Sequence, residues 1–369
     1  MSTGKLSAQQ VRDLREALMV WYDRNRRDLP WRRTGDPYAI WVSEIMLQQT
    51  RVAAVLEHYR SFMARFPTLE TLAATSEDEV LAHWSGLGYY RRARLLRKAA
   101  QFVVAECGGR LPGTAEKLRS LPGIGDYTAA AIASIGFGEP VAVVDGNVLR
   151  VMTRLQGLEG GPKAAASQVP ALAQRLLDRK RPGDFNQAMM ELGALICLPS
   201  QPQCTHCPVH EFCHTRGEHE VAPAKQMLSR RITYAVVKRK GRLRHGLRRT
   251  ELLLERRPED ASLMAGMWEL PQIPEHPEGA GGKLPLLSLR HAITNTNYYA
   301  NFFETQATEL TSEGGTGTER RWVTQNELPD MPLTGLARKA LKRLKLWPGY
   351  SGRSVPVLLP GEGLDQIVI

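Results

Sequence analysis

Four of the five cysteines in this chain lie close together, between residues 197 and 213. Four thiolates so near one another can surround one metal centre, which would fix the path of the loop that carries them. A structural zinc ion usually takes two Cys pairs separated by a longer stretch. Here the spacing is C-x6-C-x2-C-x5-C, with prolines between the cysteines, which favours a [4Fe–4S] cluster over a zinc knot, the alternative. The predicted ligands are Cys197, Cys204, Cys207 and Cys213.

The periodicity of apolar residues changes after this loop, so the chain is predicted to be multi-domain, of class α plus α+β. Residues 1–215 have apolar residues at three- and four-residue spacing, as in 39–64, 126–137 and 146–156, which predicts a helical domain. Residues 216–230 are polar and are interpreted as a linker. Residues 231–348 are predicted to form the second domain, and residues 349–369 a loosely ordered tail. The predicted elements of the second domain are strands at 232–237, 251–255, 284–289 and 298–308 and a basic amphipathic helix at 332–346.

The composition is that of a folded, basic protein. Hydrophobic residues make up 43% of the chain, which excludes wholesale disorder, and no apolar run approaches the ~18 residues that a membrane span needs. The first residues, MSTGKLSAQQ, lack the apolar region of a secretory signal. We therefore expect a cytoplasmic protein in a reducing compartment, with no membrane partner. The formal net charge of +11 favours a polyanionic partner.

The segment LPGIG (121–125) predicts a tight turn between two helices. Pro122 and Gly123 favour the turn, and Gly125 lets the backbone come close to a partner. The second helix is expected to begin near Asp126, where free N–H groups and the positive end of the helix dipole form an anion site. We interpret the turn as a phosphate-binding hairpin, with Gly123 and Gly125 at the phosphate; an ordinary helix–helix corner is the alternative.

Two acidic residues have environments that should push their protonation in opposite directions. Glu44 lies on the apolar stripe of a predicted helix that also carries Ile40 and Leu47, so burial should raise its pKa. Asp145 falls at or beside the start of another helix, where backbone N–H groups favour the ionised form. Such a pair suits cleavage of an N-glycosidic bond: Glu44 would protonate the departing base and Asp145 would stabilise the cationic sugar. The alternatives are an edge glutamate that reaches water and a purely structural cap.

Several motifs together resemble the MutY-type adenine DNA glycosylases of the endonuclease III superfamily. They are WVSEIMLQQTRV, GLGYYRRARLL, LPGIGDYTAAAIASI, VDGNVLRV and MELGALIC, and the resemblance covers roughly residues 20–215. It implies two helical subdomains with the substrate cleft between them, a [4Fe–4S] loop at 197–213, and removal of adenine mispaired with 8-oxoguanine. It also implies that Glu44 is the general acid and Asp145 the transition-state stabiliser.

The position of Tyr127 bears on the type of reaction. In bifunctional members of the superfamily the matching position, second after the last glycine of the hairpin, carries a lysine that forms a Schiff base. A phenol cannot form an imine, so we expect a monofunctional glycosylase with little strand-nicking activity. The resemblance places Tyr127 and Asn147 beside Asp145 in the site. The alternative for Tyr127 is a packing residue at the start of its helix.

The same resemblance implies residues that hold the extruded adenine and probe the duplex. Trp31, Arg32 and Glu191 match the adenine pocket of the family. Gln48, Gln49 and Tyr89 match residues that contact the duplex beside the lesion, where an amide can read base edges and an aromatic ring can wedge a base step. The alternative is that Trp31, Tyr89 and Tyr90 are core aromatics. The basic side chains of Arg91, Arg92 and Arg94 either neutralise phosphates or form a solvated face.

The second domain, 231–348, resembles the Nudix-like domain that reads the 8-oxoguanine strand in this family. LMAGMWELP (263–271) carries the resemblance, while the glutamate-rich Nudix catalytic helix is absent, so no pyrophosphatase activity is expected. The family's lesion-reading loop is commonly Phe-Ser-His; here Ile293-Thr294-Asn295 aligns with it. Thr294 keeps the hydroxyl, but Asn295 replaces the histidine, which puts the strength of lesion reading in question.

The motifs together predict a monomeric enzyme that acts on double-stranded DNA containing 8-oxoguanine:adenine or guanine:adenine mispairs. A second interpretation is a non-catalytic, cluster-bearing DNA-binding scaffold, although such a protein would be expected to lose Glu44 or Asp145. A third is a glycosylase/lyase that acts on oxidised pyrimidines, against which the missing lysine argues.

Overall fold

The computed structural model describes residues 6–159, 161–217, 226–241, 250–274, 284–310 and 319–348. The predicted tail, 349–369, and most of the predicted linker lie outside the described residues. The chain divides into two compact units. The first comprises Met1–Met227 with Asp260–Met267 and Asp330–Gly335; the second comprises Leu228–Glu259, Trp268–Pro329 and Leu336–Ile369. No helix in the described ranges is long and apolar enough to cross a membrane.

The first unit is helical, as predicted. Its α-helices are α1 (Ala8–Asn25), α2 (Pro37–Leu47), α3 (Val52–Arg65), α4 (Leu69–Ala74), α5 (Glu77–Trp84), α6 (Arg91–Glu106), α7 (Ala115–Leu118), α8 (Asp126–Phe137), α9 (Gly146–Gln156), α10 (Gly161–Leu176) and α11 (Pro182–Leu195). The segment 39–64, predicted from its period as one helical stretch, is broken between Leu47 and Val52.

Helix starts in this unit follow from local side chains. Asp36 caps α2 by accepting a hydrogen bond from the Tyr38 amide, and Pro37 occupies the first helical position, as the sequence predicts. Asp145 caps α9 by accepting from the Val148 amide. α8 begins at Asp126 directly after the LPGIG turn. The two predicted site carboxylates therefore lie on or beside well-defined helices.

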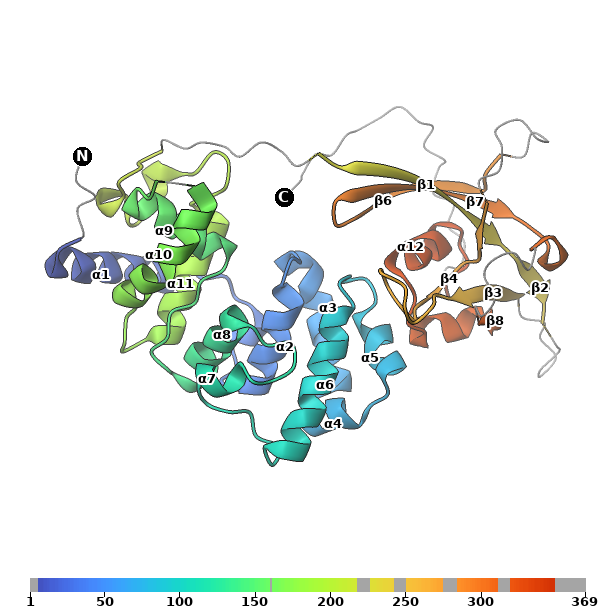
Figure 1. Ribbon diagram of the computed structural model, residues 1–369, viewed down its shortest axis with the longest axis horizontal. Helices are drawn as coiled ribbons and strands as arrows, with labels where there is room; N and C mark the ends of the chain where they lie inside the picture. Colours follow the sequence, from blue (N-terminus) through green and yellow to red (C-terminus); the bar gives the residue numbers. More distant parts are fainter. Residues whose placement is uncertain are drawn as a thin grey trace. The chain divides into compact units, whose positions relative to one another are not determined.

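The helices of the first unit pack around two separate hydrophobic cores. One core is built from α2 to α8 and includes Trp41, Phe62 and Trp84. The other joins α1 with α9, α10 and α11 and includes Leu18, Met152 and Phe185. Figure 1 shows α1 beside α9 to α11, although α1 is distant from them in sequence. The two cores correspond to the two helical subdomains that were expected.

The second unit combines strands with a helix, so the α plus α+β class is confirmed. One sheet has the order β5-β1-β7-β6, in which β1 and β7 run parallel, and the other joins β3 to β2, β4 and β8. The strands are β1 (Leu228–Val236), β2 (Lys238–Lys240), β3 (Thr250–Arg256), β4 (Trp268–Glu269), β5 (Gln272–Ile273), β6 (Leu287–Ile293), β7 (Thr296–Glu304) and β8 (Arg320–Thr324). The helix α12 spans Gly335–Arg343, shorter at both ends than predicted.

Two strand predictions have to be corrected. The strand expected at 298–308 is β7, which spans Thr296–Glu304 and is followed by a short 3-10 helix at Ala307–Glu309. The sequence places a strand at 284–289, whereas β6 begins at Leu287 and continues to Ile293. Leu284 is 88% exposed, so its apolar side chain does not pack in a sheet. Because β6 pairs with β7 up to Ile293–Thr296, Thr294 and Asn295 form the tight turn between these two strands.

Candidate active site

Glu44 lies on a helix that is buried on every side. Residues Tyr38 to Met46 of α2 are all buried, and Glu44 itself is only 6% exposed. Burial raises the pKa of Glu44 to about 7, although a hydrogen bond from Tyr127 acts in the opposite direction. The predicted rise in pKa is confirmed, and the carboxyl is poised to exist in both protonation states near neutrality. The alternative of an edge glutamate that reaches water is wrong.

Tyr127 is the immediate partner of Glu44. It is the second residue of α8, and its hydroxyl donates a hydrogen bond of 2.5 Å to Glu44 Oε2. The sulfur of Met190 lies 3.7 Å from the same hydroxyl. Burial and the adjacent Glu44 raise the pKa of Tyr127 well above its usual value, so the phenol keeps its proton and remains a donor. Tyr127 is therefore more than a packing residue.

Asp145 approaches the same place from the other core. As the N-cap of α9, it accepts hydrogen bonds from the Val148 amide at 2.6 Å and from the Asn147 side-chain amide at 3.0 Å. Its negative charge also contributes to the raised pKa values of Glu44 and Tyr127. Glu44 and Asp145 thus lie within electrostatic reach of each other at the junction of the two subdomains.

A chain of hydrogen bonds leads from Asp145 to the cysteine loop. Asn147, which donates to Asp145, accepts from Arg150 Nη2 at 2.9 Å. Arg150 also donates to the carbonyl oxygens of Gly193, at 2.8 Å, and Cys197, at 2.9 Å. Gly193 lets α9 and α11 approach, because a Cβ there would lie 2.6 Å from the Cβ of Asn147. Sequence reasoning missed Arg150 and Gly193.

The four predicted ligand cysteines share one neighbourhood. All four are half-buried. Burial raises the pKa of Cys207 to about 11, and the nearby thiols of Cys197, Cys213 and Cys204 add to the rise. Arg154 of α9, 9% exposed, donates to the carbonyl oxygens of two loop residues, Leu198 and Pro199.

Four cysteine thiols in one neighbourhood are a donor set that fits a [4Fe–4S] cluster, and zinc accepts the same donors. Among the described residues, no group of three or more His, Cys, Asp or Glu side chains is placed to hold a single metal ion.

Glu191 is the centre of a buried ion-pair cluster. It is 1% exposed, and its two oxygens accept from Arg27 at 2.8 and 2.7 Å and from Arg32 at 3.2 and 2.9 Å. Burial would raise the pKa of Glu191, but the hydrogen bonds from Arg27 and Arg32 outweigh it and lower the pKa to about 2. Arg27 was not predicted from sequence. The neighbouring Trp31 is 5% exposed, and its ring centroid lies 5.1 Å from that of Tyr59.

The residues predicted to probe the duplex occupy two adjacent turns. Gln48 donates from its side chain to Thr128 Oγ1 at 3.0 Å and is half-buried, whereas Gln49 is exposed. Tyr89 is 43% exposed, while Tyr90 is 4% exposed and lies in the core. The core alternative therefore describes the placement of Trp31 and Tyr90 but not that of Tyr89.

The hairpin turn has the geometry that a close partner would require. Gly123 has a φ of +76°, and a Cβ there would lie 2.6 Å from the Cβ of Leu95. Gly125 is the N-cap of α8, and a Cβ there would meet nothing within 4 Å, so space is open in front of the backbone. Asp126, the first residue of α8, forms a 2.8 Å ion pair with Arg119. An exposed backbone at a helix start can receive a phosphate.

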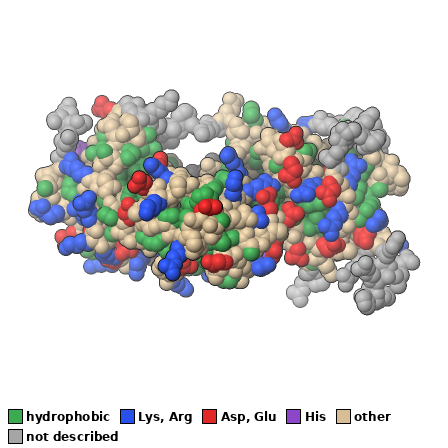
Figure 2. Space-filling model, turned by 60° about the horizontal axis from the view of Figure 1, so that its bottom comes forward, with side chains coloured by type: hydrophobic (Ala, Val, Ile, Leu, Met, Phe, Trp, Pro, Cys, Tyr) green, Lys and Arg blue, Asp and Glu red, His purple; other side chains and the backbone are tan. Residues whose placement is uncertain are grey.

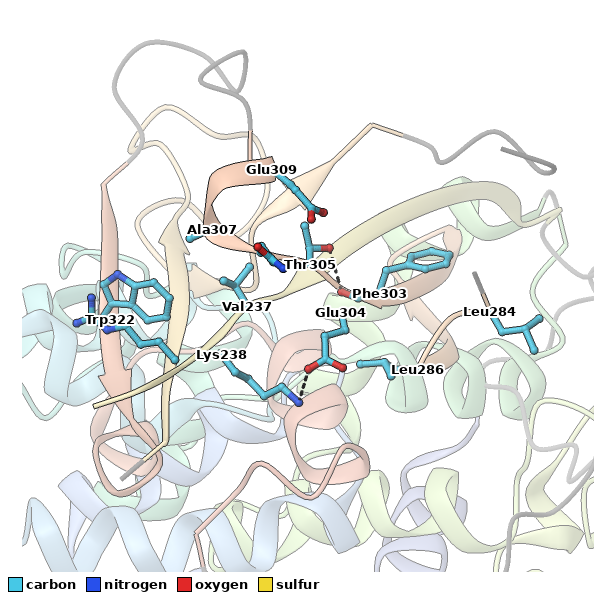
Figure 3. A pocket seen from close by; sticks show the side chains of 12 residues that line it. Val237, Lys238, Leu284, Leu286, Phe303, Glu304, Thr305, Ala307, Glu309 and Trp322 are labelled. Atoms are coloured by element: carbon cyan, nitrogen blue, oxygen red, sulfur yellow. Dashed lines mark hydrogen bonds and ion pairs between the residues drawn. The ribbon is translucent and has the colours of Figure 1, made fainter. Parts of the chain in front are cut away.

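In the second unit, Thr294 sits at the tip of the β6–β7 turn with a φ of +52°. It is exposed, as is Asn295, whose carbonyl oxygen accepts from the Leu228 amide at 2.8 Å. A cavity of about 860 Å³ in this unit is lined by Lys238, Glu304 and Trp322 among others. Figure 3 shows these side chains around it. The cavity is lined by residues at the C-terminal end of β7, whereas Thr294 precedes the N-terminal end of this strand. The cavity is therefore separate from the β6–β7 turn.

The surface charge of the described residues is mixed. On the face drawn in Figure 2, Lys and Arg side chains are interspersed with Asp and Glu rather than gathered into one continuous patch.

Comparisons with known proteins agree with this geometry. Residues 42–178 match the family described as "HhH-GPD superfamily base excision DNA repair protein". The chain is 35% identical to the adenine DNA glycosylase of Homo sapiens over 405 residues, covering 90% of this chain and 74% of the human protein. It is 48% identical to the adenine DNA glycosylase of Mus musculus over 231 residues, covering 58% of this chain but only 45% of the mouse protein.

Solved structures show a similar fold for the helical part. A thermostable thymine-DNA glycosylase matches with a TM-score of 0.53 and 30% identity, covering 57% of this chain and 98% of that chain. A non-covalent endonuclease III–DNA complex matches with a TM-score of 0.50 and 22% identity, covering 57% of this chain and 97% of that chain. The second likeness shows the fold alone.

Proposed function

Because this chain belongs to the adenine DNA glycosylase family, we propose that it removes adenine mispaired with 8-oxoguanine or guanine from duplex DNA. The observation that carries the proposal is the pair of carboxyls at the junction of the two subdomains. Glu44 has a pKa of about 7, and the charge of Asp145 reaches it from the start of α9. One acid that can be protonated and one acceptor held by N–H donors is the arrangement that base release requires.

In the proposed reaction, Glu44 donates a proton to the departing adenine. The base leaves as a neutral molecule, which raises the rate by a factor of roughly 10²–10⁴. Positive charge then develops on the deoxyribose. Asp145, oriented by the Val148 and Asn147 N–H donors, stabilises this charge. Water then forms a bond to C1′ of the deoxyribose and gives a proton to the Glu44 carboxylate, which leaves an abasic sugar and restores the acid.

We propose that the enzyme is monofunctional. The position where a lyase would carry its Schiff-base lysine holds Tyr127, whose hydroxyl is engaged with Glu44. A phenol with a raised pKa is a hydrogen-bond donor and not a nucleophile at neutral pH. Its part would be to orient the carboxyl of Glu44 and to limit the rise of its pKa.

Recognition of the base and the lesion is proposed to involve both units. Trp31, Arg32 and Glu191 would border the extruded adenine, with Glu191 acting through the guanidinium groups that it holds. Gly123 and Gly125 would receive a DNA phosphate at the start of α8. In the second unit, which we propose to be Nudix-like, Thr294 would contact the 8-oxoguanine strand from the exposed β6–β7 turn.

The four loop cysteines are proposed to hold a [4Fe–4S] cluster. Bound there, the cluster would supply four iron–sulfur bonds that tie the loop together. Arg150 and Arg154 would then connect α9, and with it Asp145, to a rigid loop. Iron analysis and the visible absorption of the purified protein would distinguish iron from zinc. Bound zinc without iron would overturn the assignment.

The activity is tested by excision from an 8-oxoguanine:adenine duplex followed by alkali cleavage of the abasic product. We expect product from the wild-type chain and a loss of at least about 100-fold in Glu44→Gln. Glu57→Gln, an exposed glutamate on α3, is the matched control and should retain activity. No product from the wild type would favour a DNA-binding scaffold. A covalent adduct trapped by borohydride would favour a lyase.

The substrate range needs a separate comparison. Excision rates are compared for the same duplex with 8-oxoguanine, guanine or thymine opposite adenine. The ratio of these rates measures how strongly excision depends on the opposite base. We expect faster excision opposite 8-oxoguanine than opposite guanine, with a smaller ratio in Thr294→Ala. Equal rates opposite 8-oxoguanine and thymine would contradict mispair specificity.

A further inference from the structure

We propose that Arg92 is a positioning residue that holds Gln49 and Tyr89 in the conformations they need beside the extruded base. The inference rests on the proposed function, because it assigns a role within the same DNA-bound state. It also corrects the two interpretations considered for Arg92 from sequence, a phosphate contact and a solvated face. The guanidinium group points inward, toward backbone carbonyls of two turns.

The two residues to be positioned have unusual backbone conformations. Gln49 has a φ of 55° and Tyr89 a φ of 49°. Both angles lie in the left-handed region, which residues other than glycine rarely adopt. Both side chains are exposed. Such conformations persist only where surrounding contacts impose them, and they are frequent at functional sites.

Arg92 supplies contacts to the first of these turns. Its Nη1 donates to the carbonyl oxygens of Ile45 at 2.6 Å, Met46 at 3.2 Å and Gln48 at 2.5 Å. These carbonyls stand at the C-terminal end of α2, where they have no partner within the helix. A cation is favourable there because the helix dipole is negative at this end. Arg92 therefore ends α2 and directs the chain into Gln49.

The same guanidinium group reaches the second turn. Its Nη2 donates to the Gly88 carbonyl at 3.3 Å, one residue before Tyr89, and to Thr50 Oγ1 at 3.2 Å, one residue after Gln49. The ring of Tyr89 lies 5.3 Å from the guanidinium carbon. One side chain thus links both turns, which are separated by about forty residues in sequence.

The buried guanidinium group of Arg92 is surrounded by carbonyl oxygens and aromatic rings and not by a carboxylate. Among the described residues no acidic side chain is recorded as influencing its charge, and burial lowers the pKa of Arg92 to about 10. Its positive charge is compensated by carbonyl oxygens and by two aromatic faces. A lysine could keep the charge but could not reach both turns with a planar fork of donors.

A small cavity accounts for the remaining donor of Arg92. The cavity has a volume of about 80 Å³ and is lined by Trp41, Gln48, Arg92 and Gly123 among others. Arg92 Nε and Trp41 Nε1 are buried, and neither has a protein acceptor among the described residues. The space is large enough for water, and water that accepts from both N–H groups would satisfy them.

The test is a mutant cycle on excision of adenine and on affinity for mispaired DNA. Arg92→Gln and Arg92→Lys are each made in the wild-type chain and in a Gln49→Ala/Tyr89→Ala background. In the wild-type chain we expect Arg92→Gln to slow single-turnover excision by about 10- to 100-fold, because hydrogen bonds from a charged group are lost. Arg92→Lys should lose less. In the double-alanine background either change should cost less than about threefold, since the residues it positions are gone.

The controls separate positioning from folding and from the proposed function. Arg97→Lys alters another arginine of α6 that donates to a carbonyl, that of Thr75, and should leave excision unchanged in both backgrounds. Equal losses for Arg92→Lys in both backgrounds would overturn the inference. If Arg92→Gln fails to fold, Arg92→Lys carries the cycle. A wild type without excision would refute the proposed function, and the cycle on DNA affinity would still decide the role of Arg92.

Discussion

Replacing Tyr127 by phenylalanine should move the pH dependence of catalysis toward higher pH. The Tyr127 hydroxyl donates to Glu44 at 2.5 Å, and this bond favours the charged carboxylate. Without it, the acid should keep its proton to a higher pH. A hydrogen bond to a charged group contributes about 1.5–3 kcal/mol, and one pKa unit corresponds to about 1.36 kcal/mol. The pKa of Glu44 should therefore rise from about 7 by about one to two units.

The assay is the single-turnover rate of adenine release from about pH 5 to about pH 10, a range that spans the pKa of Glu44. For the wild type, the rate should fall tenfold per pH unit above about 7, because only protonated Glu44 can act as the acid. In Tyr127→Phe the rate should begin to fall at a higher pH than in the wild type, whatever the change in the plateau rate. Tyr59→Phe, which removes a hydroxyl that donates to the Ala39 carbonyl, is the matched control. A fall in rate that begins at the same or a lower pH in Tyr127→Phe would refute the reasoning.

Three further substitutions test other parts of the account. Asp126→Asn removes a carboxylate from the exposed start of α8. The affinity for DNA should therefore rise about two- to fivefold at low salt and equal that of the wild type at high salt. An unchanged affinity would argue against a phosphate at this helix start. Gly193→Ala places a Cβ 2.6 Å from that of Asn147 and should lower the free energy of unfolding by about 1–3 kcal/mol, measured by urea denaturation. Glu191→Ala leaves two arginines without their buried partner and should destabilise the fold by about 3–5 kcal/mol, whereas a loss below about 1 kcal/mol would show that the cluster contributes little.

Local patterns predicted the helical scaffold, the burial of Glu44 and the position of Asp145 at a helix start. The starts of α2, α8 and α9 depend on residues next to them in sequence, such as Asp36 and Asp145. The burial of Glu44 could be inferred from its apolar neighbours one turn before and one turn after it on α2. Each of these inferences uses contacts within a few residues, which a single sequence displays directly.

The supporting arginines could not be predicted in the same way. Arg27 meets Glu191 across 164 positions of the chain, and Arg92 meets Gln48 across 44. A carbonyl oxygen that accepts from a distant arginine has no sequence signature, because every residue has a carbonyl. The break of 39–64 into α2 and α3 is of this kind, since Arg92 stabilises the end of α2 from another helix.

Errors in the second unit have a different cause. The prediction of a strand at 284–289 depended on apolar content, but Leu284 and Leu286 are exposed and the paired strand continues to Ile293. Strand pairing, rather than local hydrophobicity, sets the bounds of β6. The outcome brings Thr294 to the tip of the turn, a position that the local pattern did not indicate.

The most direct test is a structure of the Glu44→Gln variant bound to a duplex with adenine opposite 8-oxoguanine. The account predicts an extruded adenosine with the side chain at position 44 in hydrogen-bond contact with the base and the Asp145 carboxylate beside the same deoxyribose. An adenine that remains stacked in the DNA duplex would contradict the account. So would a deoxyribose that either of the two side chains fails to reach.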